Sequence, residues 1–361
     1  MMDFYDSIMC KYLIFYYEYL IIVQEQIMNI SDFSIEQIAG QRLMAGFDGK
    51  ELTGELMFLI DTVKVGGLIL FSANIETPEQ IKNLCGSAQA YARSCNQPPL
   101  IISIDQEGGQ VARLKEPSFT RFPGNPEMKS ENDAVIFAQT TAKELLGIGI
   151  NMDMAPVIDV APEGINSVMA GRSFGCDPNW VSKMGVAVIE NMQAKKLMAV
   201  AKHFPGIGRT VPDSHFELPI LDAKLCDLES FDLIPFYSAI RHNVSGIMLS
   251  HILYKKIDEK WPASLSEKIA GNLLRDHMGY EGIVMTDDLD MGAIRNNFDI
   301  KTVIKQILYA GIDMALICHT GPNIGYSFEE ILKNMRDSRA IEMKAEKSVR
   351  RILSCKEKYL L

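Results

Sequence analysis

The chain has 361 residues, of which 47% are hydrophobic and 23% are charged, a composition typical of a globular protein with a large core. Its 36 basic and 46 acidic residues give a net charge of −10, which argues against nucleic acid as a partner because phosphate contacts need clustered Lys and Arg. Seven irregularly spaced cysteines form no CxxC pair, so we expect neither a disulfide framework nor a zinc site, and a reducing compartment such as the cytoplasm fits best.

The first 30 residues differ from the rest of the chain. Residues 12–23 read YLIFYYEYLIIV, which is short for a membrane span and carries Glu18 in its middle. Acidic residues precede this run and no A-x-A cleavage site follows it, which argues against a signal peptide. We expect residues 1–30 to be an amphipathic or disordered extension, with translation starting at Met28 as the alternative, and we expect no membrane association.

From residue 31 onward, eight short apolar runs alternate with stretches of helical pattern. Several runs are nearly continuous in Ile, Leu, Val and Met, which suits strands that are buried on both faces of a parallel sheet. The runs are residues 41–47, 66–71, 100–105, 150–159, 198–204, 246–252, 282–288 and 313–318.

Helix boundary signals support this alternation. Asp177 precedes a proline and predicts a capped helix over residues 178–196. Ser264 with Glu267 has the spacing of a capping box at the start of a further helix, and Gly311 can end the helix before the last strand.

The repeated strand and helix pattern predicts an α/β fold, a (β/α)₈ TIM barrel formed as a single domain by residues 31–361. A doubly wound parallel sheet is the alternative. It is disfavoured because no Gly-rich dinucleotide fingerprint follows the first strand.

Polar side chains stand at the carboxyl ends of the apolar runs. In a barrel these ends form the catalytic face, so residues far apart in sequence would converge at one mouth. The alternative is a set of unrelated surface charges. The residues are Asp105, Asp159, Lys202, His203, His251, Asp287 and Asp288.

Two adjacent carboxylates end the seventh run. A strand end holds a side chain rigidly, as a nucleophile requires. The segment MTDDLDMGA also resembles a strand-to-helix junction, where an Asp can cap the helix. We expect Asp287 to be functional and Asp288 to be the structural member of the pair.

A second candidate pair lies in the Pro- and Gly-rich segment KHFPGIGRTVPDSH (202–215). Asp213 could hold the imidazole of His215 in one tautomer and favour its protonated form, which would make the imidazole a proton carrier. The alternative is an Asx-turn at Asp213 with an exposed His215. The spacing alone leaves both interpretations open.

Other residues could bind a ligand rich in hydroxyl groups. Lys202 and His203 could donate hydrogen bonds, although a buried, satisfied His and a snorkelling Lys fit equally. Asp105, Arg113 and Arg172 lie near paired glycines or in a Gly-rich loop, where they could bind a ligand or hold the loop. The histidines show no metal-ligand spacing and there is no G-x-S-x-G motif, so we expect no metal, no cofactor and no serine hydrolase site.

Taken together, six segments resemble glycoside hydrolase family 3, and in particular its single-domain bacterial β-N-acetylglucosaminidases (β-N-acetylhexosaminidases) of cell-wall recycling. The resemblance runs from about residue 31 to about residue 350, and its most specific part is the segment that ends in Asp-Ser-His. The segments are IDQEGGQVARL (104–114), FTRFP (119–123), GRSFGCDP (171–178), KHFPGIGRTVPDSH (202–215), PASLS (262–266) and TDDLDMGA (286–293).

The resemblance implies a (β/α)₈ barrel and a retaining mechanism on β-N-acetylglucosaminides, including muropeptide-like sugars, without a cofactor or metal. It places the nucleophile at Asp287 and the acid/base at His215, oriented by Asp213, on a loop that closes over the substrate. It places sugar binding at Asp105, Arg113, Arg172, Lys202 and His203.

Two positions depart from the family pattern, and several activities stay open. Ile207 stands where the family often has a His, and Gln110 stands where it often has an Arg. The alternatives are a β-glucosidase or β-xylosidase, a phosphorylase, a substrate-assisted mechanism in which the acetamido group attacks, and a barrel that binds glycans without catalysis.

Overall fold

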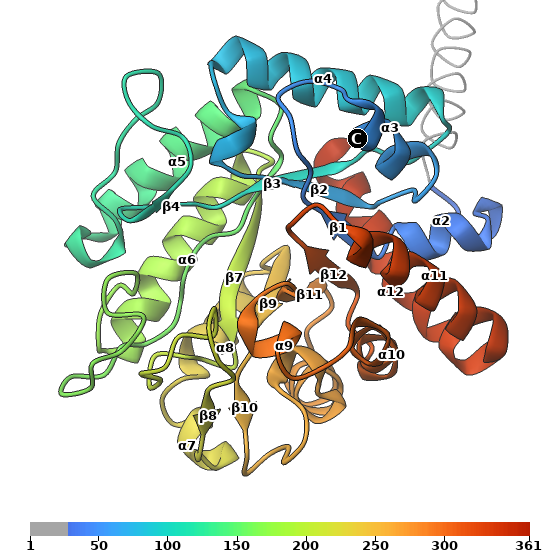
Figure 1. Cartoon of the computed structure of the whole chain (residues 1–361). Helices are drawn as coiled ribbons and strands as arrows, with labels where there is room; N and C mark the ends of the chain where they lie inside the picture. The colour runs from blue at the N-terminus through green and yellow to red at the C-terminus, as the bar shows by residue number, and fades with distance from the viewer. Residues whose placement is uncertain (1–27) are drawn as a thin grey trace, which may run out of the picture.

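Eight parallel strands close into a barrel in the computed structural model, which describes residues 28–361 (Figure 1). The strands follow one another around the barrel in chain order, and the last pairs with the first, so the predicted (β/α)₈ fold is confirmed. They are β1 (Leu43–Ala45), β2 (Gly67–Leu70), β3 (Ile101–Ile104), β6 (Met152–Asp153), β7 (Met198–Phe204), β9 (Gly246–Leu249), β11 (Ile283–Asp288) and β12 (Met314–Ile317).

Helices surround the strands on the outside of the barrel (Figure 1). The α-helices are α2 (Ile35–Gly40), α3 (Gly54–Asp61), α4 (Pro78–Ser94), α5 (Glu131–Gly147), α6 (Pro178–Ala194), α7 (Leu225–Glu229), α8 (Ile234–Arg241), α9 (Gly292–Arg295), α10 (Ile300–Ala310), α11 (Pro322–Asp337) and α12 (Arg339–Leu360). Shorter or differently wound helices are η1 (Ile30–Asp32), η2 (Ser72–Asn74), η3 (Asn125–Glu127), η4 (Ala263–Leu265) and the π-helix η5 (Lys268–His277). Two short strand pairs, β4 (Gln106–Gly108) with β5 (Val111–Ala112) and β8 (Ile220–Leu221) with β10 (Leu253–Tyr254), lie outside the barrel sheet.

Two of the three predicted helix boundaries are confirmed. The side chain of Asp177 accepts a hydrogen bond from the backbone N–H of Asn179 at 2.9 Å and caps α6. Gly311 ends α10 in the left-handed region with φ of 69°, a conformation that a residue with a Cβ adopts less readily.

The predicted capping box at Ser264 is wrong. The hydroxyl of Ser264 is buried and lies 2.7 Å from a ring nitrogen of His251. The hydroxyl of Ser266 instead accepts a hydrogen bond from the N–H of Ile269 at 3.2 Å. The helix therefore starts about two residues later than the spacing with Glu267 predicted.

The inside of the barrel is filled largely by methionines. Side chains alternate along each strand, so one set points to the barrel axis and the other packs against the helices. Methionine is unbranched and flexible, which suits an interior whose width changes from layer to layer. The buried methionines of the interior cluster are Met44, Met152, Met154, Met198, Met248, Met285 and Met314.

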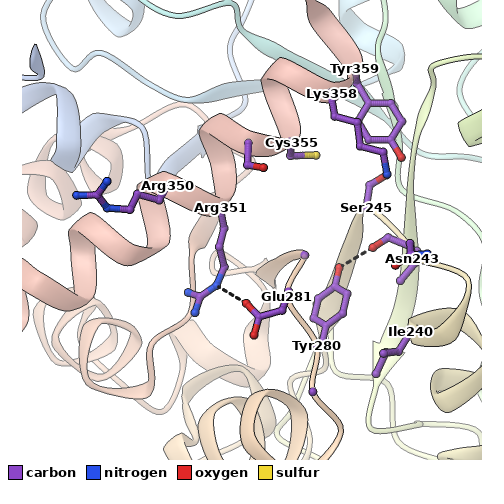
Figure 2. Close-up of a pocket in the computed structure, with 14 residues that line it drawn as sticks. Ile240, Asn243, Ser245, Tyr280, Glu281, Arg350, Arg351, Cys355, Lys358 and Tyr359 are labelled. Carbon is purple, nitrogen blue, oxygen red and sulfur yellow. Dashed lines mark hydrogen bonds and ion pairs between the residues drawn. The ribbon is translucent and has the colours of Figure 1, made fainter. Parts of the chain in front are cut away.

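A buried ion-pair network closes the amino-terminal end of the barrel. Asp313, fully buried directly before β12, accepts hydrogen bonds from Arg275 and, at 3.1 Å, from Arg351 of α12. A cavity of about 530 Å³ lies beside this network, between α8, α12 and the starts of β9 and β11 (Figure 2). Glu281 is the one carboxylate among the residues that line it, and this end of a barrel is generally concerned with stability.

The expectations for the amino-terminal extension lie almost entirely outside the described residues. Within residues 28–361, none of the helices combines the length and the apolar character that crossing a membrane requires.

The substitution Asp313→Asn should lower the free energy of unfolding by about 3 kcal/mol, because it leaves the largely buried guanidinium of Arg275 without a counter-charge and Arg351 with only the exposed carboxylate of Glu281. Urea unfolding measures this effect. Glu281→Gln is the matched control, because Glu281 approaches the same Arg351 at 3.8 Å but its side chain is 83% exposed. Equal, small effects of both substitutions would contradict the proposed importance of the Asp313 network.

Candidate active site

The polar residues at the strand ends converge at the carboxyl end of the barrel. A cavity of about 230 Å³ opens there, and its lining combines residues from β7, from the end of β11 and from the segment after β7. The titratable residues that line it are Arg172, His203, Asp213, His215 and Asp287.

The centre of the mouth is a buried network of opposite charges. The ammonium of Lys202, which is 2% exposed, lies 2.8 Å from Asp105 and 2.7 Å from Glu107. Asp105 also pairs with Arg113 at 3.1 Å, and Glu107 accepts two hydrogen bonds from Arg172 at 2.6 and 2.9 Å. Two carboxylates thus face three cations, which leaves the network with a net positive charge.

The cations keep both carboxylates ionised. Burial alone would raise the pKa of Asp105, but Lys202 and Arg113 outweigh burial and hold that pKa well below its usual range. Burial opposes ionisation of Glu107 in the same way, and Lys202 and Arg172 again lower its pKa. The mouth therefore presents fixed charged donors and acceptors.

Asp159 orients His203. One carboxylate oxygen lies 2.8 Å from the ring Nδ1 of His203 and accepts its backbone N–H, while the other accepts the N–H of Ile207 at 2.8 Å. With Nδ1–H donating to Asp159, the Nε2 of His203 faces Arg172 at 3.5 Å. His203 is thus buried and held, with its second nitrogen on the cavity side.

Asp287 lies at the end of β11 with its side chain on the cavity wall. One oxygen accepts the N–H of Asp288 at 2.8 Å. Burial raises its pKa, but the imidazoles of His251 and His203, the N–H of Asp288 and the ammonium of Lys202 together outweigh this effect, so the pKa lies below its usual value. Asp287 is therefore an ionised carboxylate, as a nucleophile must be.

His251 and Asp288 support this strand end. Nε2 of His251 lies 2.8 Å from the backbone carbonyl of Asp288, and burial lowers the pKa of the imidazole. Asp288 accepts the N–H groups of Asp290 and Cys318 at 3.1 and 3.0 Å. Asp288 thus ties β11 to the end of β12 and does not cap α9, whose N-cap is Met291.

The Asp213 and His215 pair combines the Asx-turn with a contact between the carboxylate and the imidazole. One oxygen of Asp213 accepts the backbone N–H of His215 at 2.9 Å, which is an Asx-turn, and lies 2.7 Å from its ring Nδ1. The two side chains are 62% exposed for His215 and 40% exposed for Asp213. The contact uses Nδ1 of His215, and Nε2 has no hydrogen-bond partner among the described residues.

The two departures from the family pattern both reach the cavity wall. Ile207 is 6% exposed and contributes to the lining of the cavity. Gln110 also lines it and lies close to Gly171.

Two site residues were missed in the sequence. Glu107 stands two positions after Asp105, on the same side of an extended backbone, which is a signal that could have identified it. Asp153 ends β6 and is fully buried, with one oxygen accepting the N–H of Gln106 at 2.9 Å and the other without a partner among the described residues. Burial raises the pKa of Asp153 to about 8.

Comparisons with known proteins identify the family of the chain. The profile described as the glycosyl hydrolase family 3 N-terminal domain matches residues 34–355. A β-hexosaminidase of Alkalilimnicola ehrlichii is 36% identical over 286 residues, which cover 77% of this chain and 80% of that protein.

Solved structures are similar over most of the chain. A family 3 β-N-acetylglucosaminidase from a Paenibacillus species superposes with a TM-score of 0.88 at 34% identity, covering 91% of this chain and 63% of that one. A β-N-acetylhexosaminidase from Beutenbergia cavernae superposes with a TM-score of 0.83 at 26% identity, covering 90% of this chain and 99% of that one. This chain therefore spans less than two thirds of the Paenibacillus protein and nearly all of the Beutenbergia protein.

The raised pKa of Asp153 predicts a specific dependence of stability on pH. Because the folded pKa of about 8 exceeds the ordinary 3.8, the folded protein binds a proton at Asp153 more tightly than the unfolded chain does. The contribution of this proton to stability is complete below pH 3.8 and is lost as the pH rises through 8. Relative to Asp153→Asn, the wild-type free energy of unfolding should fall by about 1 kcal/mol per pH unit between pH 5 and 8. Urea unfolding at several pH values measures this difference, and parallel profiles for the two proteins would contradict the assignment.

Proposed function

Because this chain belongs to glycosyl hydrolase family 3, we propose that it is a retaining β-N-acetylhexosaminidase that releases terminal, non-reducing β-linked N-acetylglucosamine. The observation that carries the proposal is a single cavity lined by an ionised strand-end carboxylate, Asp287, and by the Asp213–His215 pair. These are the two groups that glycoside cleavage with retention requires, a nucleophile and a proton carrier.

The proposed first step is the transfer of the sugar to Asp287. A carboxylate oxygen of Asp287 forms a bond to the anomeric carbon while the bond from that carbon to the leaving oxygen breaks. The protonated imidazole of His215 gives its Nε2 proton to the leaving oxygen. Asp213, held below its usual pKa by the hydrogen bonds from His215 despite partial burial, compensates the imidazolium charge.

The proposed second step releases the sugar. His215, now neutral, takes a proton from water, and the water oxygen attacks the anomeric carbon as the bond to Asp287 breaks. Two inversions at the same carbon leave the product in the β configuration. Side chains alone supply this chemistry, so the proposal needs no cofactor.

We assign sugar binding to members of the charge network at the mouth and to the neighbouring His203. Charged donors and acceptors form strong hydrogen bonds with hydroxyl groups, and a site built from them rejects analogues that leave its groups unpaired. The residues are Asp105, Arg113, Arg172, Lys202 and His203. The proposed substrates include muropeptide-like sugars, which the resemblance to cell-wall recycling enzymes supports. The proposed compartment is the cytoplasm, which the cysteine pattern supports.

A product assay tests the proposed function. Incubation with a β-N-acetylglucosaminyl disaccharide from the cell wall should release free β-N-acetylglucosamine at the same rate with and without phosphate, as followed by NMR. Phosphate-dependent formation of a sugar 1-phosphate would overturn the hydrolase in favour of a phosphorylase. A faster rate on aryl β-glucoside or β-xyloside than on aryl β-N-acetylglucosaminide would overturn the sugar specificity.

The substitution Asp287→Asn should reduce kcat on an aryl β-N-acetylglucosaminide by at least about 10³-fold, because no covalent intermediate can form. Asp276→Asn, at an exposed position of η5, is the matched control and should keep its activity. Near-normal turnover of the Asp287 variant would remove this residue from the mechanism.

The substitution His215→Ala should slow a substrate with a poor leaving group by about 10²-fold or more and a dinitrophenyl substrate far less, because a good leaving group needs no proton. His277→Ala removes an exposed imidazole elsewhere and serves as control. An equal loss on both substrates would argue against proton donation by His215.

A further inference from the structure

The segment that carries His215 is bound to the segment that follows Asp287. The backbone N–H of Gly292 donates to the carbonyl oxygen of His215 at 3.0 Å, and the N–H of Ala293 donates to the carbonyl oxygen of Ser214 at 3.0 Å. Gly292 stands only five residues after Asp287. Two main-chain hydrogen bonds thus connect the segment that carries His215 with the segment that follows Asp287.

A third contact lies beside these two. The side-chain amide of Asn296 donates to the carbonyl oxygen of Phe216 at 3.3 Å. The carbonyl oxygens of the three consecutive residues 214–216 therefore accept hydrogen bonds from α9 and from the residue that follows it. We call this set of contacts the α9 latch.

The latch requires a glycine at its centre. A Cβ added to Gly292 would lie 2.6 Å from the carbonyl oxygen of His215 and 2.7 Å from that of Phe216. Both contacts are with backbone atoms, which cannot turn aside as the end of a flexible side chain can. Any residue other than glycine must push the segment that bears His215 away from α9.

The other end of the same segment is held independently. The hydroxyl of Tyr254 donates to the carbonyl oxygen of Gly206 at 2.8 Å, and Asp159 accepts the N–H of Ile207 at 2.8 Å. Between these contacts and the latch, Val211 is 56% exposed, and Phe216 beside His215 is 76% exposed. The contacts of Gly206 and Ile207 thus fix where the segment starts, and the latch fixes the position of His215.

We propose that Gly292 is a positioning residue for the acid/base, acting through the α9 latch to set the distance between His215 and Asp287. The proposal rests on the proposed function, in which His215 donates the proton. The latch supplies the geometric precision that an exposed imidazole on a long segment lacks, since proton transfer requires hydrogen-bond distance to the leaving oxygen. It acts on the position of His215 and leaves the carboxylate of Asp287 in place.

The test measures kcat/KM of three variants on substrates with a poor and with a good leaving group. Gly292→Ala should lower kcat/KM about tenfold or more on a substrate with a poor leaving group and much less on a dinitrophenyl substrate, within the 10²–10⁴-fold that a general acid supplies. Asn296→Ala, an exposed and gentler change, should give about a threefold loss in the same direction, as for one weak hydrogen bond. Gly325→Ala in α11, where an added Cβ meets nothing within 4 Å, is the matched control and should keep wild-type rates.

A double-mutant cycle separates this proposal from the one on which it rests. In the His215→Ala background, Gly292→Ala should cause no further loss on either substrate, because the group that the latch positions is gone. The same loss in both backgrounds, or an equal loss on good and poor leaving groups, would overturn the latch. If Gly292→Ala does not fold, the absence of a leaving-group-dependent loss in Asn296→Ala overturns it. Failure of His215→Ala itself to show leaving-group dependence would overturn the acid/base assignment, and the latch with it.

Discussion

The buried ammonium of Lys202, held between the carboxylates of Asp105 and Glu107, is the interaction on which the mouth of this barrel depends. Removing two carboxylates from water costs several kcal/mol each unless a counter-charge and hydrogen bonds compensate. Lys202 supplies that compensation from the centre, and Arg113 and Arg172 supply it from the rim. The barrel can therefore hold ionised groups at fixed positions in a largely buried site. Because these groups are already in place, they need not reorganise around a bound sugar as water molecules would.

Strand β7 links this network to the proposed chemistry. It ends with Lys202, His203 and Phe204, so the strand that carries the central cation also carries the imidazole held by Asp159. The chain leaves the barrel at once toward Asp213 and His215, and returns against α9, directly after the strand of Asp287. Strands β7 and β11, which are separated by β9 in the closed sheet, thus hold the centre of the charge network and the proposed nucleophile, and the chain between them carries the proposed proton carrier.

Much of the fold could be predicted because the barrel strands are continuous apolar runs, and parallel strands bring their carboxyl ends together whatever their distance in sequence. Predictions from local motifs were wrong or incomplete where a side chain contacts a residue that is distant in the sequence. Ser264 has the spacing of a capping box, yet its hydroxyl is committed to His251. Glu107 stands beside paired glycines in the sequence, and the two cations that compensate its burial come from the distant positions 172 and 202. The contact between Gly292 and His215 also joins segments that the sequence shows only as separate motifs.

The covalent link between sugar and Asp287 is the central claim, and chemical trapping tests it most directly. Because carbon 2 of the substrate bears the acetamido group, the inactivator should carry fluorine at carbon 5 and fluoride as its leaving group, so that the glycosyl-enzyme forms faster than water releases it. Mass spectrometry of the digested protein should then show one added N-acetylglucosamine-type residue on the peptide that contains Asp287, and no adduct in Asp287→Asn. An adduct at another residue would contradict the account by identifying a different nucleophile. Turnover without any adduct would contradict it and favour attack by the acetamido group.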